Sequence, residues 1–229
     1  MPIITIFSGT FCKEQSVVPK LLSDNGYRLI MDKDVLARAS DLSGVAEDKL
    51  ERAFSAKTSV FNKFTHEKER SISDLRLALA EILSNNKLLF VGFVSQLIPK
   101  EISHVLRVCL IADMGFRTAL AAKEEGMSEK EAAKLIHRED EDRATWVYSV
   151  HKRNDPWNAT LYDIVIPTDK MREEEAVSLI GEILNKDVLK TTFQSKKAVE
   201  DFLLASKVEV ALSKEGHDIA VKANKGAVT

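Results

Sequence analysis

Short apolar runs alternate with longer amphipathic segments along the first 185 residues. The runs are rich in Val, Ile and Leu and have the length of strands that are covered on both faces. They span residues 3–7, 27–31, 88–92, 104–111 and 161–166. Between them, apolar residues recur at helical spacing in 17–22, 32–39, 71–83, 115–125 and 173–184. Strands that alternate with helices predict an α/β layered fold with a parallel sheet.

Local signals place the ends of two of these helices. Asn25-Gly26 supplies a stop for the first helix. Ser128 with Glu131 three residues later is a capping box, which predicts a helix that starts there and continues past Arg143. The segment 46–64 is polar and compatible with a helix, but its periodicity is weak.

The pattern changes after residue 186. Apolar residues recur at helical spacing over 196–212, and 217–221 alternates like a half-exposed strand. Asn224-Lys225-Gly226 predicts a turn into a second strand. We therefore expect a main domain over 1–186 and a small α+β appendage over 187–229.

Composition excludes several classes of protein. The 229 residues are 45% hydrophobic and 30% charged, which suits a large domain with a substantial core. The net charge of −2 gives no field for steering toward nucleic acid, so no nucleic-acid partner is expected. There is no basic leader and no apolar run long enough to span a bilayer, so we expect a cytoplasmic protein.

Cysteines and histidines give no sign of a metal centre. The two cysteines, Cys12 and Cys109, suit a reducing compartment, and no pair of histidines has a zinc-ligand spacing. We expect no metal site. Cys12 lies at a helix N-terminus, where the pKa of a thiol can fall, so a reactive thiol and a small hydrophobic side chain both remain open.

The first strand-to-helix turn has part of a phosphate-binding motif. Residues 9–16 (GTFCKEQS) keep the first glycine and the final hydroxyl residue of G-x-x-x-x-G-K-[ST]. Glu14 replaces the second glycine and Gln15 replaces the lysine, which brings a carboxylate close to any bound phosphate. The candidate phosphate-binding residues are Gly9, Thr10, Lys13 and Ser16, with Lys13 as the substitute cation. An ordinary β-to-α turn is the alternative.

Three segments farther along carry a resemblance to a known family. Residues 115–143, with the helix that begins GMSEKEA, residues 154–156 (NDP) and residues 161–169 (LYDIVIPTD) resemble the cytidylate kinase-like family over about 1–185. The resemblance implies a three-layer P-loop kinase fold with a parallel five-stranded sheet and a lid helix at about 128–150. It also implies ATP and Mg²⁺ as cofactors.

The resemblance assigns roles on the lid helix. Arg138 and Arg143 would approach the transferring phosphoryl group, with Asp140 beside them as the third candidate catalytic residue. The alternative is that residues 138–143 form a solvated charged face with pairs inside the helix.

The acceptor side shows a match and a departure. Asp32-Lys33 matches the family's Asp-Lys, which implies substrate binding, although Asp32 could instead be a helix N-cap. Phe93 stands where the family has an arginine that helps to hold the nucleoside monophosphate.

The C-terminal segment has a weaker likeness. Residues 197–229 resemble the first helix, strand and turn of a BON domain, which implies a protein or membrane-associated partner. A plain extension that packs on the main domain is the alternative.

Together these features favour a nucleotide-binding or anion-sensing regulatory protein with impaired phosphotransfer. The alternative is an active nucleoside monophosphate kinase of the cytidylate type that uses ATP. A purely structural role would follow if no ligand binds.

Overall fold

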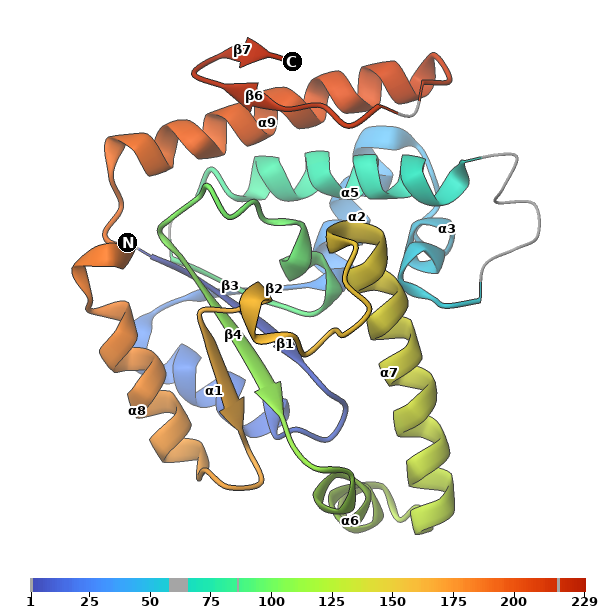
Figure 1. Ribbon diagram of the computed structural model, residues 1–229, viewed down its shortest axis with the longest axis vertical. Coiled ribbons are helices and arrows are strands. Elements are labelled where there is room, and N and C mark those ends of the chain that lie inside the picture. The colour runs from blue at the N-terminus through green and yellow to red at the C-terminus, as the bar shows by residue number, and fades with distance from the viewer. Residues whose placement is uncertain (1, 58–65, 86, 218) are drawn as a thin grey trace.

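All five apolar runs form one parallel sheet. In the computed structural model, which describes residues 2–57, 66–85, 87–217 and 219–229, the order of strands is β2-β3-β1-β4-β5 (Figure 1). The central strand β1 is buried at all six positions and pairs with β3 and β4. The predicted five-stranded α/β sheet is confirmed. The bounds are β1 Ile3–Ser8, β2 Arg28–Met31, β3 Leu88–Val91, β4 Val105–Ile111 and β5 Ile164–Pro167.

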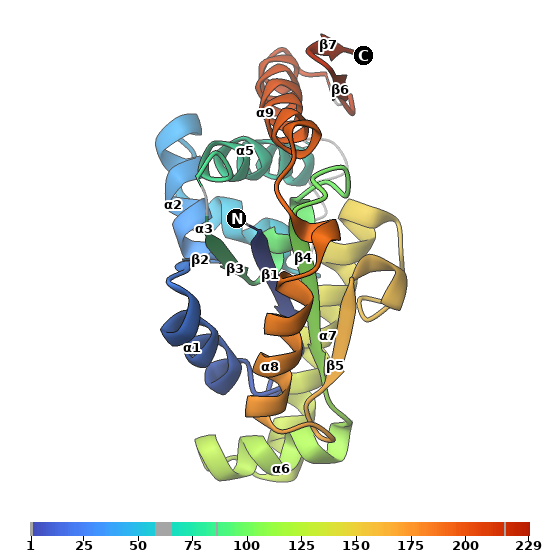
Figure 2. The ribbon, with the colours of Figure 1, turned by 90° about the vertical axis from the view of Figure 1, so that its left-hand side faces the viewer.

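Helices cover both faces of the sheet, which makes three layers (Figure 2). One apolar core joins the sheet to α1 (Glu14–Asn25) and α8 (Glu173–Leu184). A second core joins the other face to α2, α3, α5 and α7. The bounds of these are α2 Asp32–Ser43, α3 Glu47–Glu51, α5 Glu67–Ile82 and α7 Glu129–His151. The described residues also form four short 3₁₀ helices: η1 Arg52–Phe54, η2 Phe93–Leu97, η3 Ala159–Leu161 and η4 Asp187–Leu189.

Residues on α6 and α7 reach the carboxyl edge of the sheet. Helix α6 (Met114–Glu125) follows β4 directly, and α7 runs from α6 back along the sheet (Figure 1). The capping box that opens α7 is confirmed: the Ser128 N–H donates to the Glu131 carboxylate at 3.0 Å, and the Glu131 N–H donates to the Ser128 hydroxyl at 3.3 Å. The helical stop after α1 is also confirmed, since Gly26 has φ 62°.

The weakly periodic segment 46–64 is only partly described. It contains α3 and η1, while 58–65 lie outside the described residues. Of the helices that the structure describes, none combines the length and apolar character needed to cross a membrane.

The C-terminal segment packs on the main domain through one long helix. Helix α9 (Phe193–Lys214) lies along α5, and an ion pair of 2.8 Å joins Arg76 of α5 to Glu209 (Figure 1). A hairpin of β6 (Ala223–Asn224) and β7 (Ala227–Val228) follows, and its turn donates two N–H groups to the Asp201 carboxylate at 2.7 and 2.8 Å.

The predicted turn at 224–226 is therefore confirmed, but the predicted strand over 217–221 is wrong. The two sides of the hairpin pair through their backbones from the turn as far as Lys222 and Thr229, which exchange two hydrogen bonds. The described residues of 217–221 lie beyond this last pair, have no strand opposite them and do not form a strand. Whether 187–229 forms a separate domain stays a prediction.

Candidate functional site

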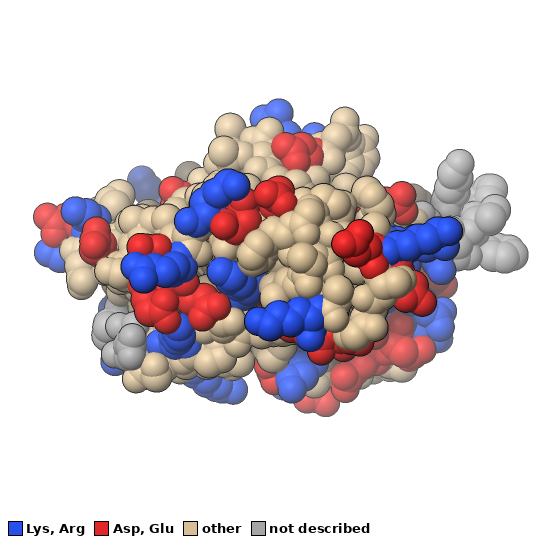
Figure 3. Space-filling view, turned by 90° about the horizontal axis from the view of Figure 1, so that it is seen from below, with Lys and Arg blue, Asp and Glu red and all other residues tan. Residues whose placement is uncertain are grey.

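A cavity of about 720 Å³ opens at the carboxyl ends of β1, β2 and β3. Its apolar lining comes from the strands and from α2, η1 and η2. Its polar lining comes from the last residue of β1 and the first of α1, from α2, α3 and η1, and from α7, while residues 9–13 between β1 and α1 are not part of the lining. Figure 3 views the molecule from below, the side to which the strands point, and acidic and basic side chains are interspersed there without a large patch of one sign. The apolar lining includes Phe7, Met31, Leu36, Phe54 and Phe93.

The loop between β1 and α1 is the first part of the site. Gly9 is buried, and its N–H donates to the Leu110 carbonyl at 3.1 Å. Phe11 and Lys13 both have left-handed backbone angles, with φ 58° and 56°. The backbone N–H groups of residues 10–15 donate no hydrogen bond to another described residue. These groups, together with the N-terminal end of α1, are donors for an anion.

Glu14 places a negative charge at the same loop. Helix α1 begins at Glu14, whose carboxylate accepts a hydrogen bond from the Ser8 hydroxyl and lines the cavity. Lys13, the expected substitute cation, lies with its ammonium group 5.2 Å from the centre of the Phe116 ring on α6. The Glu14 carboxylate is thus bonded to Ser8, and the Lys13 ammonium group lies over the Phe116 ring.

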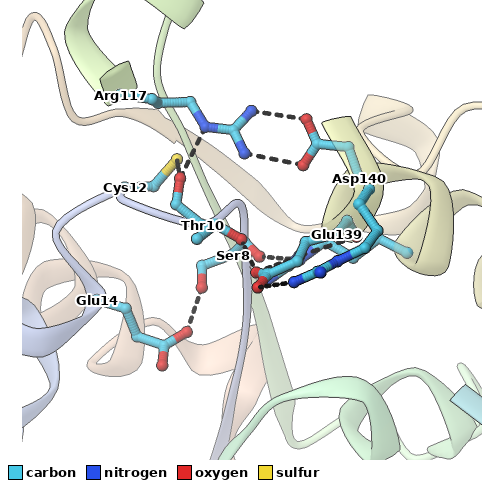
Figure 4. A network of polar contacts seen from close by, with 9 residues as sticks. Ser8, Thr10, Cys12, Glu14, Arg117, Glu139 and Asp140 are labelled. Atoms are coloured by element: carbon cyan, nitrogen blue, oxygen red, sulfur yellow. Dashed lines mark hydrogen bonds and ion pairs between the residues drawn. The ribbon is translucent and has the colours of Figure 1, made fainter. Parts of the chain in front are cut away.

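Sequence reasoning missed Arg117, which joins the loop to helix α7 (Figure 4). Its side chain on α6 is 6% exposed and makes two parallel hydrogen bonds of 2.8 Å to the Asp140 carboxylate on α7. Its Nε also donates to the Thr10 carbonyl at 2.7 Å. Arg117 lies within the segment that carries the family resemblance, but nothing in the one-dimensional pattern distinguishes it from other helical arginines.

The two predicted lid arginines both line the cavity but have different surroundings. Arg143 donates to the Ser8 carbonyl at 2.7 Å and to the Glu139 carbonyl at 3.0 Å, and its guanidinium lies 5.6 Å from the centre of the Phe93 ring. Arg138 is 61% exposed and lies 4.0 Å from the Glu139 carboxylate. Glu139 also accepts a hydrogen bond from the Thr10 hydroxyl. The charged segment 138–143 therefore makes pairs within the helix and also contacts the loop.

Asp32 lines the cavity and holds the start of η2. Its carboxylate accepts hydrogen bonds of 2.9 Å from the N–H groups of both Phe93 and Val94. Burial raises the pKa of Asp32 to about 6. The alternative of Asp32 as a helix N-cap is wrong, because the cap position is Met31, whose N–H donates to Asp34 at 2.8 Å.

Lys33 and Ser16 complete the set of predicted residues. Lys33 is exposed and lines the cavity. Ser16 is half-buried in the first turn of α1, and its N–H donates to the Lys13 carbonyl at 3.1 Å. No group of three or more metal-ligating side chains is present in the described parts of the chain.

Cys12 does not have the surroundings of a reactive thiol. It is buried in the loop, and burial raises its pKa to about 11. A Cβ added at Gly9 would lie 2.9 Å from its sulfur and 3.3 Å from the Arg117 guanidinium carbon. A side chain at position 9 would thus force Cys12 or Arg117 to shift. The interpretation of Cys12 as a small hydrophobic side chain is the one that fits.

A comparison with protein families decides the membership of the chain. Residues 3–170 match the cytidylate kinase-like family. The chain belongs to this family. The match covers the five-stranded sheet, the loop between β1 and α1, and helix α7, and ends before α8. A search of curated proteins gave no match.

Two solved structures are similar to this member of the cytidylate kinase-like family. One is an uncharacterized protein from Eubacterium ventriosum ATCC 27560, with a TM-score of 0.61 and 15% identity over 81% of this chain and 99% of that chain. The other is TT1252 from Thermus thermophilus, with a TM-score of 0.42 and 19% identity over 81% of this chain and 98% of that chain. The first likeness supports the fold.

Proposed function

We propose that the protein is a nucleotide-binding or anion-sensing regulatory protein, in which the cytidylate kinase-like fold is retained and phosphotransfer is impaired. The observation that carries this proposal is the Glu14 carboxylate, which is bonded to Ser8 inside the phosphate loop. A carboxylate at this place repels the phosphates of ATP, while the fold around it still offers donors for an anion.

Binding is supported by the loop and by the cavity beside it. The backbone N–H groups of residues 10–15 have no acceptor among the described residues, and the N-terminal end of α1 adds a favourable dipole. The cavity of about 720 Å³ has an apolar wall and a polar rim, which is the usual composition of a small-molecule site.

The family implies ATP and Mg²⁺, and the residues present fit a metal-bound nucleotide better than a free one. Glu14 and the Ser16 hydroxyl are oxygen donors of the kind that Mg²⁺ prefers. When bound, Mg²⁺ would neutralise charge on the phosphates and reduce their repulsion by Glu14. The loop N–H groups would hold the phosphate oxygens, and Lys13 would have to leave the Phe116 ring to reach them.

The proposal that phosphotransfer is impaired is supported by the protein contacts that Arg117 and Arg143 already make. Arg143 is bonded to two backbone carbonyls, and Arg117 is paired with Asp140. Stabilisation of a transferring phosphoryl group requires positive charge that is directed at its oxygens. Each of these arginines would have to share or give up a protein partner before it could act.

Thermal shift measurements test the proposal. The melting temperature should rise with millimolar ATP, ADP or CMP, more with Mg²⁺ than without it, because a ligand that binds only the folded state stabilises it. Absence of a shift with every nucleotide and with inorganic phosphate would contradict the binding function.

An active nucleoside monophosphate kinase is the second candidate. The observation in its favour is that Arg138, Arg143 and the acceptor-side Lys33 line the same cavity. ADP release in a coupled assay with ATP·Mg²⁺ and each common nucleoside monophosphate distinguishes the two functions, since turnover above the background rate would favour the kinase.

We also propose that the segment 187–229 contacts a protein or a membrane-associated partner and that the protein is cytoplasmic. The first proposal is supported by Phe193, which is 80% exposed at the start of α9, and by the neighbouring exposed Val188. Loss of partner recovery on Phe193→Ser, with an unchanged melting temperature, would support this role.

A further inference from the structure

We propose that Arg117 is the positioning residue of the phosphate loop and that it couples the conformation of the loop to the position of helix α7. This inference goes beyond the proposed function and does not depend on it, because it concerns the protein without a ligand. Three elements meet at this one guanidinium group: the consecutive helices α6 and α7, and the loop after β1, which lies about a hundred residues earlier in the chain.

The first step of the argument concerns the peptide between Thr10 and Phe11. Arg117 Nε donates to the Thr10 carbonyl at 2.7 Å. Because a trans peptide is planar, its N–H points in the direction opposite to its carbonyl, so the Phe11 N–H is directed away from Arg117. The peptide between Ser8 and Gly9 is also fixed, because its carbonyl accepts from Arg143 and its N–H donates to the Leu110 carbonyl. The arginines thus set the directions of the first N–H groups of the loop.

The second step concerns helix α7. The two bonds from Arg117 to Asp140 use both terminal nitrogens of the guanidinium group and both oxygens of the carboxylate, and the Arg117 side chain is 6% exposed. Forked pairs of this kind fix orientation as well as distance. Figure 4 shows the side chains of Arg117 and Asp140 facing each other above the loop residues Thr10 and Cys12. Release of Asp140 would therefore disturb both the helix and the loop.

The contacts of α7 farther along its length are different in kind. Trp146 is fully buried and donates its indole N–H to the Phe93 carbonyl at 2.7 Å. The C-terminal half of α7 is therefore held by the core, whereas the half before Arg143 buries Ala132 and Ile136 and is also bonded to the loop and to Arg117. This difference allows the coupling to be tested separately from the stability of the whole helix.

Hydrogen exchange of the unliganded protein in Arg117→Lys and Asp140→Asn is the test. Lysine keeps the charge but cannot form the fork, and asparagine keeps the shape but removes the charge. We expect exchange to accelerate on the order of tenfold in two segments, the bonded N–H groups that flank the loop (those of Gly9, Ser16 and Val17) and residues 129–140, because a charge-assisted bond is lost. Exchange over 144–151 should stay unchanged.

Lys134→Ala is the matched control, since Lys134 is exposed on α7 and none of the contacts described above involves it. It should leave exchange in both segments as in the unmodified protein. Two results would overturn the proposal: unchanged exchange at Gly9, Ser16 and Val17 in both folded variants, or acceleration that is confined to only one of the two segments. Uniform acceleration that includes 144–151 would also overturn it, because Arg117 would then act on global stability alone.

Discussion

Removal of the Glu14 charge is expected to strengthen nucleotide binding. Glu14→Gln keeps an oxygen that can accept the hydrogen bond from Ser8, so the loop should retain its shape while it loses one negative charge. The carboxylate lies beside the free N–H groups of the loop, so a phosphate bound to them would be repelled by it. For a separation of about 6 Å and an effective dielectric constant of about 20, two unit charges repel by about 3 kcal/mol.

The half-exposed position of Glu14 reduces this repulsion by solvent screening. We therefore expect the Kd for ATP to fall by about tenfold to thirtyfold, which corresponds to about 1.4–2 kcal/mol. Titration calorimetry without Mg²⁺ measures the effect, and the gain should shrink as salt is added. Cytidine, which carries no phosphate, should bind both proteins equally.

Glu129→Gln is the matched control for this experiment. Glu129 is also a glutamate in the first turn of a helix, but it is exposed on α7 and does not line the cavity. Its substitution should leave the Kd for ATP unchanged. The electrostatic argument would be refuted if Glu14→Gln changed the Kd for ATP by less than twofold, or if it improved cytidine binding as much as ATP binding.

Three further predictions concern the packing and titration of single residues. Trp146→Ala should lower the free energy of unfolding by about 3–5 kcal/mol in urea titrations, because Trp146 is fully buried, whereas Tyr148→Ala, at a side chain that is 51% exposed, should change it by less than about 1 kcal/mol. The raised pKa of Asp32, about 6 in the folded protein against about 4 when unfolded, means that the folded state binds this proton more tightly. The contribution of Asp32 to stability should therefore grow as the pH falls from 7 to 4, and the melting temperature of the unmodified protein should rise relative to that of Asp32→Asn over this range; a constant difference would contradict the raised pKa. Cys12 and Cys109 are buried with raised pKa values, so a thiol reagent at pH 8 should label them only after unfolding, and rapid labelling of the folded protein would contradict the packing of the loop.

The fold could be predicted because its signals are local. The strands of the sheet are buried on both faces, so they are continuous apolar runs, and the helix ends carry their own signals at Gly26 and Ser128. The strand expected over 217–221 failed for a reason that is not local. An alternating pattern is compatible with a strand, but a strand also needs a partner strand beside it. The backbone pairing of the hairpin ends at Lys222 and Thr229, so residues 217–221 have no partner there.

The candidate site could be predicted only in part. The sequence located the loop and the lid helix, because both follow from a short motif and from a family resemblance. It could not reveal that Arg117 binds Thr10 and Asp140, since these partners are 107 and 23 residues away in the chain. It also could not reveal that Asp32 would hold the N–H groups of η2, because the approach of β2 to β3 brings them together.

Nucleotide binding and phosphotransfer, measured on the same preparation, test the central claim most directly. The protein would be titrated with ATP·Mg²⁺ by calorimetry and then assayed for ADP release with CMP and the other common nucleoside monophosphates. We predict saturable binding of ATP·Mg²⁺ with ADP release no faster than the background rate. Turnover above background would contradict impaired phosphotransfer, and the absence of any binding would contradict the nucleotide-binding function.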